Sequence, residues 1–289
     1  MIISESIRET REQVKEWKRQ GLRVGFVPTM GYLHEGHRSL MEAARKENDR
    51  VAVSIFVNPI QFGPNEDFAS YPRDMEKDAA LCEDAGVDLV FHPDAGEMYG
   101  EGFSTYVDME GLTKELCGKS RPVHFRGVQT VVCKLFHIIP ADRAYFGQKD
   151  AQQLAVIKKM VRDLGMDIEI VGCPIVREPD GLAKSSRNTY LNAEERQAAL
   201  VLDRSLAAGR KLVEAGERDA LKIKECIAGE IGKEKLAKTD YVEIVDFADI
   251  TPIENLEDAK NGEILCAIAV YIGKTRLIDN FIYRISECR

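Results

Sequence analysis

The fold of this protein is decided by a stretch that reads LRVGFVPTMGYLHEGHRSLMEAARKENDRVAVSIFV over residues 22–57. Residues 22–27 are a short apolar run, and residues 35–48 carry apolar side chains at helical spacing. Residues 51–57 are a continuous apolar run rich in β-branched residues. This order predicts a strand, a helix and a second strand, and continuous apolar strands are typical of a parallel sheet buried on both faces.

The same alternation continues along the chain. The next expected elements are a helix over 72–85, a strand over 87–91, a helix over 127–139, a strand over 143–146, a helix over 151–164 and a strand over 167–171. Helices that alternate with apolar strands predict an α/β fold with a Rossmann-like parallel sheet. Ligands of such sheets bind beyond the carboxyl ends of the strands.

The pattern changes after about residue 190. The expected elements there are helices over 193–215 and 219–231 and strands over 241–245, 264–272 and 276–283, with a tight turn at Gly273-Lys274. We interpret this part as a smaller C-terminal α+β domain. With the boundary in the loop at 177–188, the sequence predicts two domains, residues 1–180 and residues 181–289.

Composition limits the classes of function. The 289 residues carry 40 Lys and Arg against 48 Asp and Glu, a net charge of −8 and a pI near 5.4. This acidic balance disfavours nucleic acid or an anionic membrane as the main partner and favours a small-molecule site with locally placed cations. The chain becomes charged within five residues of Met1 and has no apolar stretch of about 18 residues, so we expect a cytoplasmic protein.

The seven cysteines are scattered and include no Cys-x-x-Cys pair. This usage predicts neither a disulfide framework nor a zinc ribbon. We expect most of them to be small core residues in a reducing compartment.

The segment His34-Glu35-Gly36-His37 stands where the first strand runs into the first helix. Two imidazoles three residues apart lie on one face of a helix start, where free backbone N–H groups favour an anion. We interpret this segment as a phosphate site. The alternatives are two ordinary helix-start histidines or a zinc pair, and no third ligand stands at a matching spacing for zinc.

Two further segments carry cations. Lys149 follows a strand and offers a point charge for phosphate, while Asp150 beside it binds ribose hydroxyls or simply caps the helix. Residues 180–188 are rich in glycine, serine and cations. They form either a mobile phosphate clamp or a solvated linker.

Amide side chains follow the second strand. Asn58 and Gln61 can recognise a hydroxyl or a carboxylate, and Met30 and Phe62 offer apolar walls. A surface turn is the alternative.

Other motifs do not point to the same chemistry. Residues 117–120 read CGKS like the end of a P-loop, but Thr113 occupies the position where that motif needs glycine. A G-x-G-x-x-G fingerprint is also missing, so the sequence does not support a dinucleotide cofactor. We expect His92 and His137 to be structural, and His124 to lie in a basic loop that helps to bind anions.

Taken in order, residues 28–37, 56–62, 146–153 and 180–191 resemble the pantothenate synthetase family, the pantoate–β-alanine ligases of coenzyme A biosynthesis. That family belongs to the nucleotidyl transferases with a "HIGH" motif, for which residues 34–37 are the counterpart. Residues 184–187 stand in for its "KMSKS" loop. The resemblance covers nearly the whole chain, and several matches in the same order make it specific.

The resemblance implies an ATP-dependent condensation of (R)-pantoate with β-alanine to pantothenate, AMP and pyrophosphate. It implies a pantoyl adenylate intermediate, Mg²⁺ and a homodimer. Residues 1–180 would bind ATP and pantoate, and residues 181–289 would form a lid. We expect the dimer contacts at edge strands near 51–57 or 100–110.

The resemblance also implies residue roles. The catalytic residues would be His34, His37, Lys149 and Arg187. The ATP-binding residues would be Met30, His37, Gly147, Lys149, Asp150, Val176, Lys184, Ser185, Ser186 and Arg187. The pantoate-binding residues would be Met30, Asn58, Gln61 and Gln153. Many family members have Met where this chain has Lys184, and Gly where it has Val123.

Two rival functions are compatible with the same residues. An adenylyltransferase would leave AMP on its product, since a helix start of this kind serves that chemistry as well. A nucleotide-binding scaffold would bind ATP without catalysis, although the two histidines, Lys149 and Arg187 argue against it.

Overall fold

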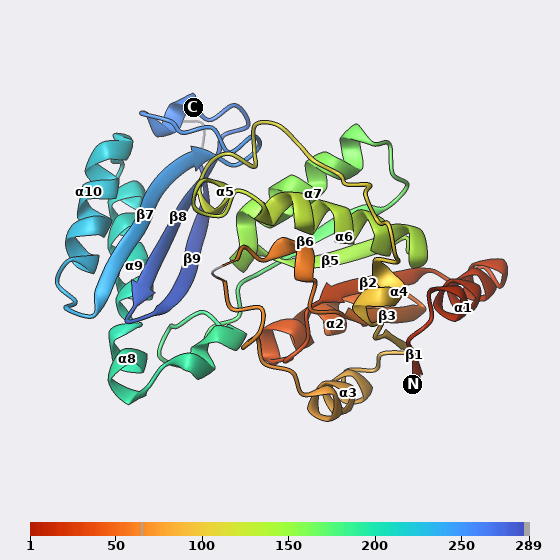
Figure 1. The fold of residues 1–289 in the computed structure, drawn as a ribbon. Coiled ribbons are helices and arrows are strands. Elements are labelled where there is room, and N and C mark those ends of the chain that lie inside the picture. The colour runs from red at the N-terminus through yellow and green to blue at the C-terminus, as the bar shows by residue number, and fades with distance from the viewer. Residues whose placement is uncertain (65, 286–289) are drawn as a thin grey trace. The chain divides into compact units, whose positions relative to one another are not determined.

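The computed structural model describes residues 1–64 and 66–285, and its contacts divide the chain into two compact units (Figure 1). Unit 1 comprises Met1–Met109, Arg121–Gln148 and Val156–Pro174. Unit 2 comprises Glu110–Ser120, Lys149–Ala155 and Ile175–Arg289. The chain therefore passes between the units several times, and the single domain boundary at residue 180 stays a prediction.

Unit 1 contains a six-stranded sheet in which every registered pair is parallel. Its strands, in spatial order, are β1 (Ile2–Ser4), β4 (Leu89–Phe91), β3 (Arg50–Ile55), β2 (Val24–Thr29), β5 (Arg143–Gly147) and β6 (Glu169–Cys173). The predicted α/β fold with a parallel sheet is confirmed. The strand order reverses between β2 and β5, and the carboxyl ends at such a reversal form the usual ligand-binding crevice.

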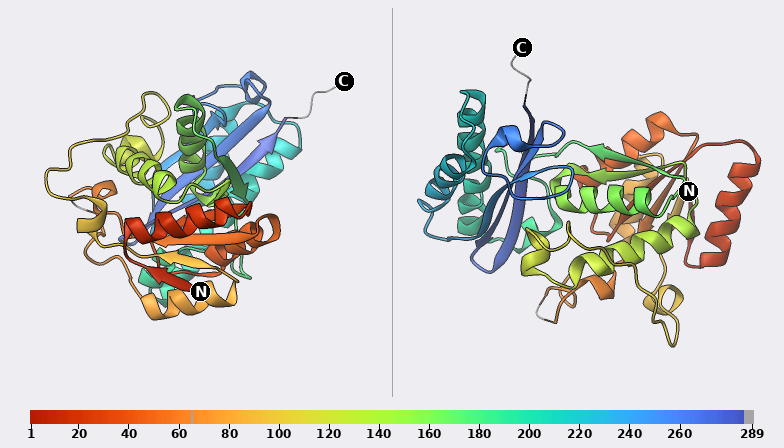
Figure 2. Two further views of the ribbon diagram at one scale, coloured as in Figure 1. Left: turned by 90° about the vertical axis from the view of Figure 1, so that its right-hand side faces the viewer. Right: turned by 90° about the horizontal axis from the view of Figure 1, so that it is seen from above.

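Helices cover both faces of this sheet (Figures 1 and 2). One face carries α1 (Ile7–Arg19), α6 (His124–Ile138) and α7 (Ala151–Asp163), and the other carries α2 (Glu35–Glu47) and α3 (Met75–Asp84). Successive strand residues point to opposite faces. Phe26 accordingly packs edge-on against Phe136 of α6, while Val27 joins the buried cluster around Met41 of α2.

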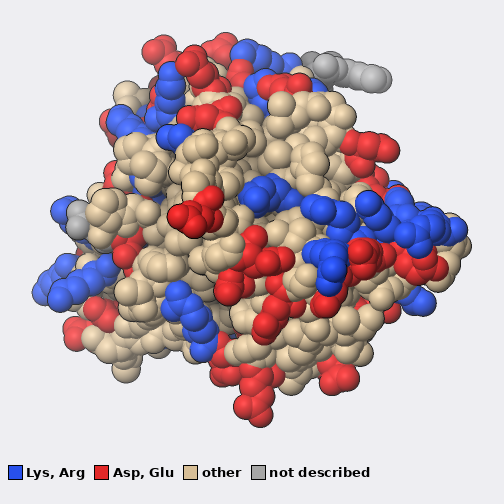
Figure 3. All heavy atoms as spheres, turned by 45° about the vertical axis from the view of Figure 1, so that its right-hand side comes forward, with Lys and Arg blue, Asp and Glu red and all other residues tan. Residues whose placement is uncertain are grey.

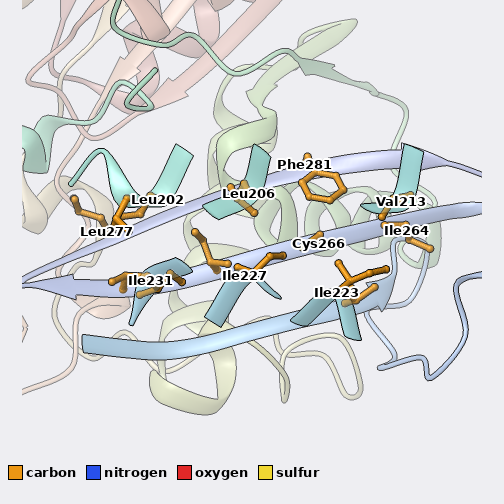
Figure 4. Close-up of a cluster of buried hydrophobic side chains, with 14 of the residues drawn as sticks. Leu202, Leu206, Val213, Ile223, Ile227, Ile231, Ile264, Cys266, Leu277 and Phe281 are labelled. Carbon is orange, nitrogen blue, oxygen red and sulfur yellow. The ribbon is translucent and has the colours of Figure 1, made fainter. Parts of the chain in front are cut away.

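Unit 2 contains a three-stranded antiparallel sheet in the order β7-β8-β9. The strands are β7 (Ala237–Asp246), β8 (Glu263–Ile272) and β9 (Thr275–Arg284), and the helices are α8 (Ala193–Ala198), α9 (Val201–Glu214) and α10 (Ala220–Ile231). Apolar side chains of α9 and α10 pack with those of the sheet into one buried cluster that includes Leu206, Ile227 and Phe281 (Figure 4). This cluster confirms the predicted α+β character.

Short elements complete the fold. They are η1 (Pro59–Gln61), α4 (Ala95–Met98), α5 (Cys117–Ser120), η2 (Gln148–Asp150), η3 (Ser186–Tyr190) and η4 (Leu256–Asp258). The CGKS segment is thus the short helix α5.

Several predicted boundaries were wrong. The helix expected from residue 72 begins at Met75, because the Asp74 side chain accepts the backbone N–H of Lys77 and caps the helix there. The helix expected over 193–215 is interrupted by a turn at 199–200 and forms α8 and α9. The sequence patterns do not predict β1 and α1.

The expectation that residues 51–57 and 100–110 are edge strands was also wrong, while their contact with a second copy stays a prediction. β3 is an interior strand with partners on both sides, and residues 100–110 form no strand. Neither segment offers the free strand edge that the expectation required.

Four of the cysteines, Cys82, Cys117, Cys173 and Cys266, are buried free thiols, as predicted. Cys133 and Cys226 are half-buried, and Cys288 lies outside the described residues. No helix in the described part of the chain is long and apolar enough to cross a membrane. Acidic and basic side chains lie next to one another over the face drawn in Figure 3.

Candidate active site

The two histidines of the first motif cap the helix that they begin. The His34 ring accepts the backbone N–H of Gly36 through Nδ1 at 3.1 Å, and the His37 ring accepts the backbone N–H of His34 through Nδ1 at 3.2 Å. The two rings lie with centroids 4.1 Å apart. α2 therefore starts with a reciprocal capping box in which both side chains are imidazoles.

This capping box decides the tautomer of both rings. A backbone N–H can only donate, so each Nδ1 must accept and carries no proton. A neutral imidazole in this state has its N–H at Nε2. In each ring, Nδ1 thus accepts a backbone N–H at the helix start, while Nε2 carries a proton. An N–H donor of this kind is what an anionic ligand binds.

The turn before these histidines is held by a buried carboxylate. Gly31 and Tyr32 both have positive φ, at 83° and 52°. Asp78 of α3 accepts the backbone N–H of Tyr32 at 2.7 Å and that of Leu33 at 2.6 Å, and the residue is 1% exposed. Burial raises the pKa of Asp78 above its ordinary value, and the two amides oppose that rise. Asp78 thus fixes a backbone conformation that is costly for Tyr32.

The predicted amide residues form one network after β3. Asn58 Nδ2 donates to Gln61 Oε1 at 2.9 Å, and Gln61 Nε2 lies 3.0 Å from Met30 Sδ. Asn58 and Gln61 are 1% and 6% exposed. The structure therefore brings together three of the four predicted pantoate residues, and the surface-turn alternative is wrong for these buried amides. Gln153 lies half-buried in α7.

A hollow of about 740 Å³ opens at the carboxyl ends of β1, β3 and β4. Met30, Gly31, Asp78 and His92 are among the residues that line it. Its volume lies in the range of small-molecule sites. Unit 1 therefore has a hollow of suitable size at the carboxyl edge of the sheet, where the sequence predicts that ligands bind.

The second motif follows the end of β5. Gly147 is its last residue, and a Cβ built there would meet no described atom within 4 Å. The carbonyl of Lys149 accepts a hydrogen bond from Asn280 Nδ2 at 2.9 Å, and Lys149 Nζ lies 3.7 Å from Asp150 Oδ2. Open space at Gly147 leaves room for a ligand against the backbone.

The third motif is a tightly bonded loop. Ser185 caps η3 by accepting the backbone N–H of Arg187 at 3.3 Å, and Lys184 Nζ lies 2.9 Å from Glu178 Oε2. The carbonyl of Val176 accepts the N–H of Lys184 at 2.9 Å. These bonds give the loop a defined shape, so a freely solvated linker is the wrong description.

The base of this loop is tied to β9. Arg177 donates to both carboxylate oxygens of Asp279, at 2.6 and 3.0 Å. Asp279 is 1% exposed, and its pKa is raised by burial while Arg177 opposes the rise. Ser186 is buried at 8% exposed, and Arg187 is half-buried.

Known proteins resemble this chain over its whole length. The sequence profile of the family described as Pantoate-beta-alanine ligase matches residues 2–282. A pantothenate synthetase of Enterococcus faecalis is 60% identical over 285 residues, which cover 99% of this chain and 100% of the relative. One of Clostridium novyi is also 60% identical, with 99% and 100% covered. The chain belongs to the pantoate-beta-alanine ligase family.

Solved structures agree with this assignment. The ligase superimposes on a crystal structure of pantothenate synthetase from Thermus thermophilus with a TM-score of 0.91, at 46% identity over 97% of this chain and 99% of that one. It matches the Francisella tularensis pantoate-beta-alanine ligase, solved with beta-gamma ATP and beta-alanine, with a TM-score of 0.78 at 35% identity over 98% and 97%. The resemblance seen in the motifs is confirmed, and this chain is an enzyme of the ligase class.

The other motif residues of the ligase have structural contacts. His92 Nδ1 donates to the carbonyl of Ile55 at 2.8 Å and His137 Nδ1 to that of Cys133 at 2.7 Å. His124 Nδ1 lies 3.1 Å from the carbonyl of Gln61. His124 begins α6, and its predicted role in binding anions stays a prediction.

Sequence reasoning missed Asp78. The signal was a charged residue on the apolar face of a helix, at the spacing that Met75, Cys82 and Ala85 share with it. It also missed Tyr99, whose hydroxyl donates to Asn58 Oδ1 at 2.7 Å and which no sequence pattern marks. His34 and His37 belong to unit 1, while Lys149 and Arg187 belong to unit 2. The convergence of these four side chains on one triphosphate stays a prediction.

Proposed function

We propose that this ligase condenses pantoate with β-alanine at the expense of ATP, through pantoyl adenylate, and releases AMP and pyrophosphate. The observation that carries the proposal is the family match over residues 2–282, with His34 and His37 at the carboxyl end of β2, beside the reversal of strand order. Use of ATP is supported by the related ligase of Francisella tularensis, which was solved in complex with beta-gamma ATP and beta-alanine.

In the first half-reaction, a pantoate carboxylate oxygen attacks the α-phosphorus of ATP, and the bond to the β-phosphate oxygen breaks with loss of pyrophosphate. This chemistry needs positioning and charge neutralisation rather than a protein nucleophile. Carboxylate and triphosphate repel each other strongly unless cations lie between them. We assign the charge neutralisation to Lys149 and Arg187, and we assign to the neutral His34 and His37 rings the donation of hydrogen bonds to phosphate oxygens through their Nε2–H groups.

In the second half-reaction, the amine of β-alanine attacks the acyl carbon of the adenylate, and AMP leaves as the amide bond forms. An acyl adenylate hydrolyses in water, so solvent must be excluded between the two steps. We propose residues 1–180 as the catalytic part and residues 181–289 as the lid.

The remaining residue assignments are part of the same proposal. Gly147 and Asp150 contact the ribose. Val176, Met30 and the clamp residues Lys184, Ser185 and Ser186 contact ATP. Pantoate is held by Met30, Asn58, Gln61 and Gln153. The buried amide network and the open space at Gly147 support these assignments.

We further propose that Mg²⁺ enters as the magnesium complex of ATP. Among residues 1–64 and 66–285, no group of three or more His, Cys, Asp or Glu side chains could hold a metal ion. The described chain thus offers no protein cage, and phosphate oxygens are ligands that Mg²⁺ commonly uses. When bound, the ion would neutralise phosphate charge.

A homodimer and a cytoplasmic location complete the proposal. β1 is one of the two edge strands of the parallel sheet, and its Ile2 and Ile3 are 46% and 51% exposed, which suits contact with a second copy. The free thiols among the described cysteines suit a reducing compartment. Light scattering of the purified protein tests the dimer directly.

The decisive experiment is pantoate-dependent exchange of labelled pyrophosphate into ATP without β-alanine, followed by product analysis when β-alanine is added. We expect exchange in the first assay, and AMP with pantothenate in the second. Pantothenate synthesis without exchange would contradict the adenylate route. AMP retained on the product would indicate an adenylyltransferase, and ATP binding with neither reaction would indicate a scaffold.

A further inference from the structure

A chain of hydrogen bonds connects Tyr99 with Gln61 inside unit 1. Tyr99 follows α4, and its hydroxyl donates to Asn58 Oδ1 at 2.7 Å. Asn58 Nδ2 then donates to Gln61 Oε1 at 2.9 Å. Tyr99 itself is assigned to no substrate in the proposed function, and it lies 41 residues along the chain from Asn58.

A backbone carbonyl decides which group donates and which accepts in each of these hydrogen bonds. Asn58 Nδ2 also donates to the carbonyl of Gly127, at 3.2 Å. A carbonyl can only accept, so the amino end of Asn58 must face Gly127 and Gln61. Its oxygen must then face Tyr99, which can satisfy it only by donating.

The orientation of the Asn58 amide also fixes the orientation of the Gln61 amide. Because the oxygen of the Gln61 amide receives the Asn58 bond, the amino group is the end that faces Met30 Sδ, at 3.0 Å. A thioether sulfur is a weak acceptor, which a substrate oxygen could replace. Gln61 therefore presents a donor, and never an acceptor, at this side.

Tyr99 is suited to act as a permanent donor. Its ring contacts those of Phe56 and Phe103, with centroids 6.1 and 4.8 Å away. Burial raises the pKa of its hydroxyl well above the ordinary value, so the proton stays on the oxygen at physiological pH. The backbone around Gln61 is equally confined, since a Cβ at Gly127 would lie 2.6 Å from Gln61 N.

We propose that Tyr99 is a positioning residue that, with the Gly127 carbonyl, holds the Gln61 amide with its NH₂ group toward pantoate. The site consequently selects a ligand that places an oxygen acceptor, a hydroxyl or a carboxylate, against Gln61. This inference rests on the proposed function, because that function places Gln61 at pantoate.

The test is Tyr99→Phe, which keeps the ring and removes the donor. Loss of one neutral hydrogen bond raises the KM for pantoate about 3- to 10-fold, while kcat and the KM for ATP stay within about 2-fold. Tyr106→Phe is the matched control. Tyr106 is 40% exposed, and its ring, which lies 4.0 Å from the Arg126 guanidinium carbon, is retained in the variant. We expect Tyr106→Phe to keep the wild-type kcat and the wild-type KM for pantoate and for ATP.

A double-mutant cycle separates positioning from a general structural role. In a Gln61→Ala background, Tyr99→Phe causes no further rise in the KM for pantoate, because its effect acts through the Gln61 amide. Additive effects would overturn the proposal, and so would a rise in the KM for ATP equal to that for pantoate. An unchanged KM for pantoate in a folded Tyr99→Phe variant would also overturn it.

Failure of the proposed function gives different results. Wild-type protein without pantoate-dependent exchange, or Gln61→Ala with an unchanged KM for pantoate, would reject the assignment of Gln61 to pantoate and this inference with it. A different result would reject only the inference about Tyr99. In that case the wild type catalyses pyrophosphate exchange and Gln61→Ala raises the KM for pantoate, but Tyr99→Phe leaves that KM unchanged.

Discussion

The two sheets of this ligase use their polar side chains differently. At the carboxyl edge of the parallel sheet, Asn58, Gln61 and Asp78 are buried and bond to backbone groups and amides of the loops. In the antiparallel unit, the buried polar contacts include ion pairs, such as Arg177 with Asp279, beside an apolar core. In a parallel sheet, the loops that follow the strands meet at one edge and can form a ligand site there. In the antiparallel unit, the ion pair instead anchors the base of one loop, at Arg177, to β9.

The same contrast appears in close packing. A Cβ at Gly127 of α6 would lie 2.4 Å from the carbonyl oxygen of Ile60, which is backbone. A Cβ at Gly209 of α9 would lie 2.5 Å from Cδ1 of Ile227, the end of a side chain. Backbone positions near the amide network are thus confined, while the antiparallel unit can adjust through side-chain rotation.

The largest effect is expected from Arg177→Met, which tests the ion pair of the antiparallel unit. The variant leaves Asp279 buried without its guanidinium partner, although the carboxylate still accepts the N–H of Asn280. We expect the free energy of unfolding, measured by urea titration at pH 7, to fall by about 3–5 kcal/mol. Arg196→Met, which breaks a more exposed pair with Asp180, is the control and costs about 1 kcal/mol or less.

The Arg177→Met variant also changes the pH dependence of stability. Burial already raises the pKa of Asp279, and removal of Arg177 raises it further. A carboxyl with a raised folded-state pKa contributes stability below its ordinary pKa and loses it as pH rises through the raised value. The difference between wild type and variant should therefore be small near the ordinary pKa of an aspartate and should grow as pH rises, until Asp279 is ionised in the variant as well. An equal difference at all pH values would contradict the buried-charge explanation.

Lys149→Ala tests whether chemistry depends on the residue that follows β5. Loss of a charge contact made in the transition state should lower the rate of adenylate formation by about 10²-fold or more. The measurement is single-turnover formation of pantoyl adenylate. Lys159→Ala, which removes a lysine paired with Asp163 near the end of α7, should leave the rate unchanged. A near-normal rate in Lys149→Ala would refute its role.

Gly127→Ala tests the confinement of backbone in the parallel unit. We expect a loss of about 1–3 kcal/mol in the free energy of unfolding, together with a higher KM for pantoate, because η1 must move. Gly209→Ala should cost less, since Ile227 can turn away. Gly229→Ala in α10 meets no atom within 4 Å and should gain up to about 1 kcal/mol. Equal losses in all three would remove the contrast between the units.

The smallest effect is expected from Tyr145→Phe. Tyr145 donates to Glu47 Oε2 at 2.8 Å, and this bond lowers the pKa of Glu47 below its ordinary value. A lowered folded-state pKa contributes stability above the ordinary pKa, and that contribution is lost as pH falls through the folded value. Thermal unfolding should show a modest decrease in Tm at pH 7 that shrinks toward pH 3, and a decrease independent of pH would contradict this account.

Much of the fold and part of the site follow from local patterns. Apolar spacing predicted the strands that became β2, β3, β5 and β6, and the position of His34 and His37 at the start of α2. The patterns failed at β1 and α1, and at the split between α8 and α9. They also failed in assigning residues 51–57 and 100–110 to edge strands, because interior and edge strands are distinguished by their neighbours and not by their own residues.

The sequence by itself determined the α/β class, the positions of the motifs and the family, because periodicity and motif spacing are properties of short segments. Only the tertiary structure decided that the imidazoles cap their own helix, that Asp78 holds the turn before them and that Tyr99 directs the amide of Gln61. The contacts of Asp78 and Tyr99 join residues more than 40 positions apart, so they exist only after the order of strands and crossovers has brought those residues together.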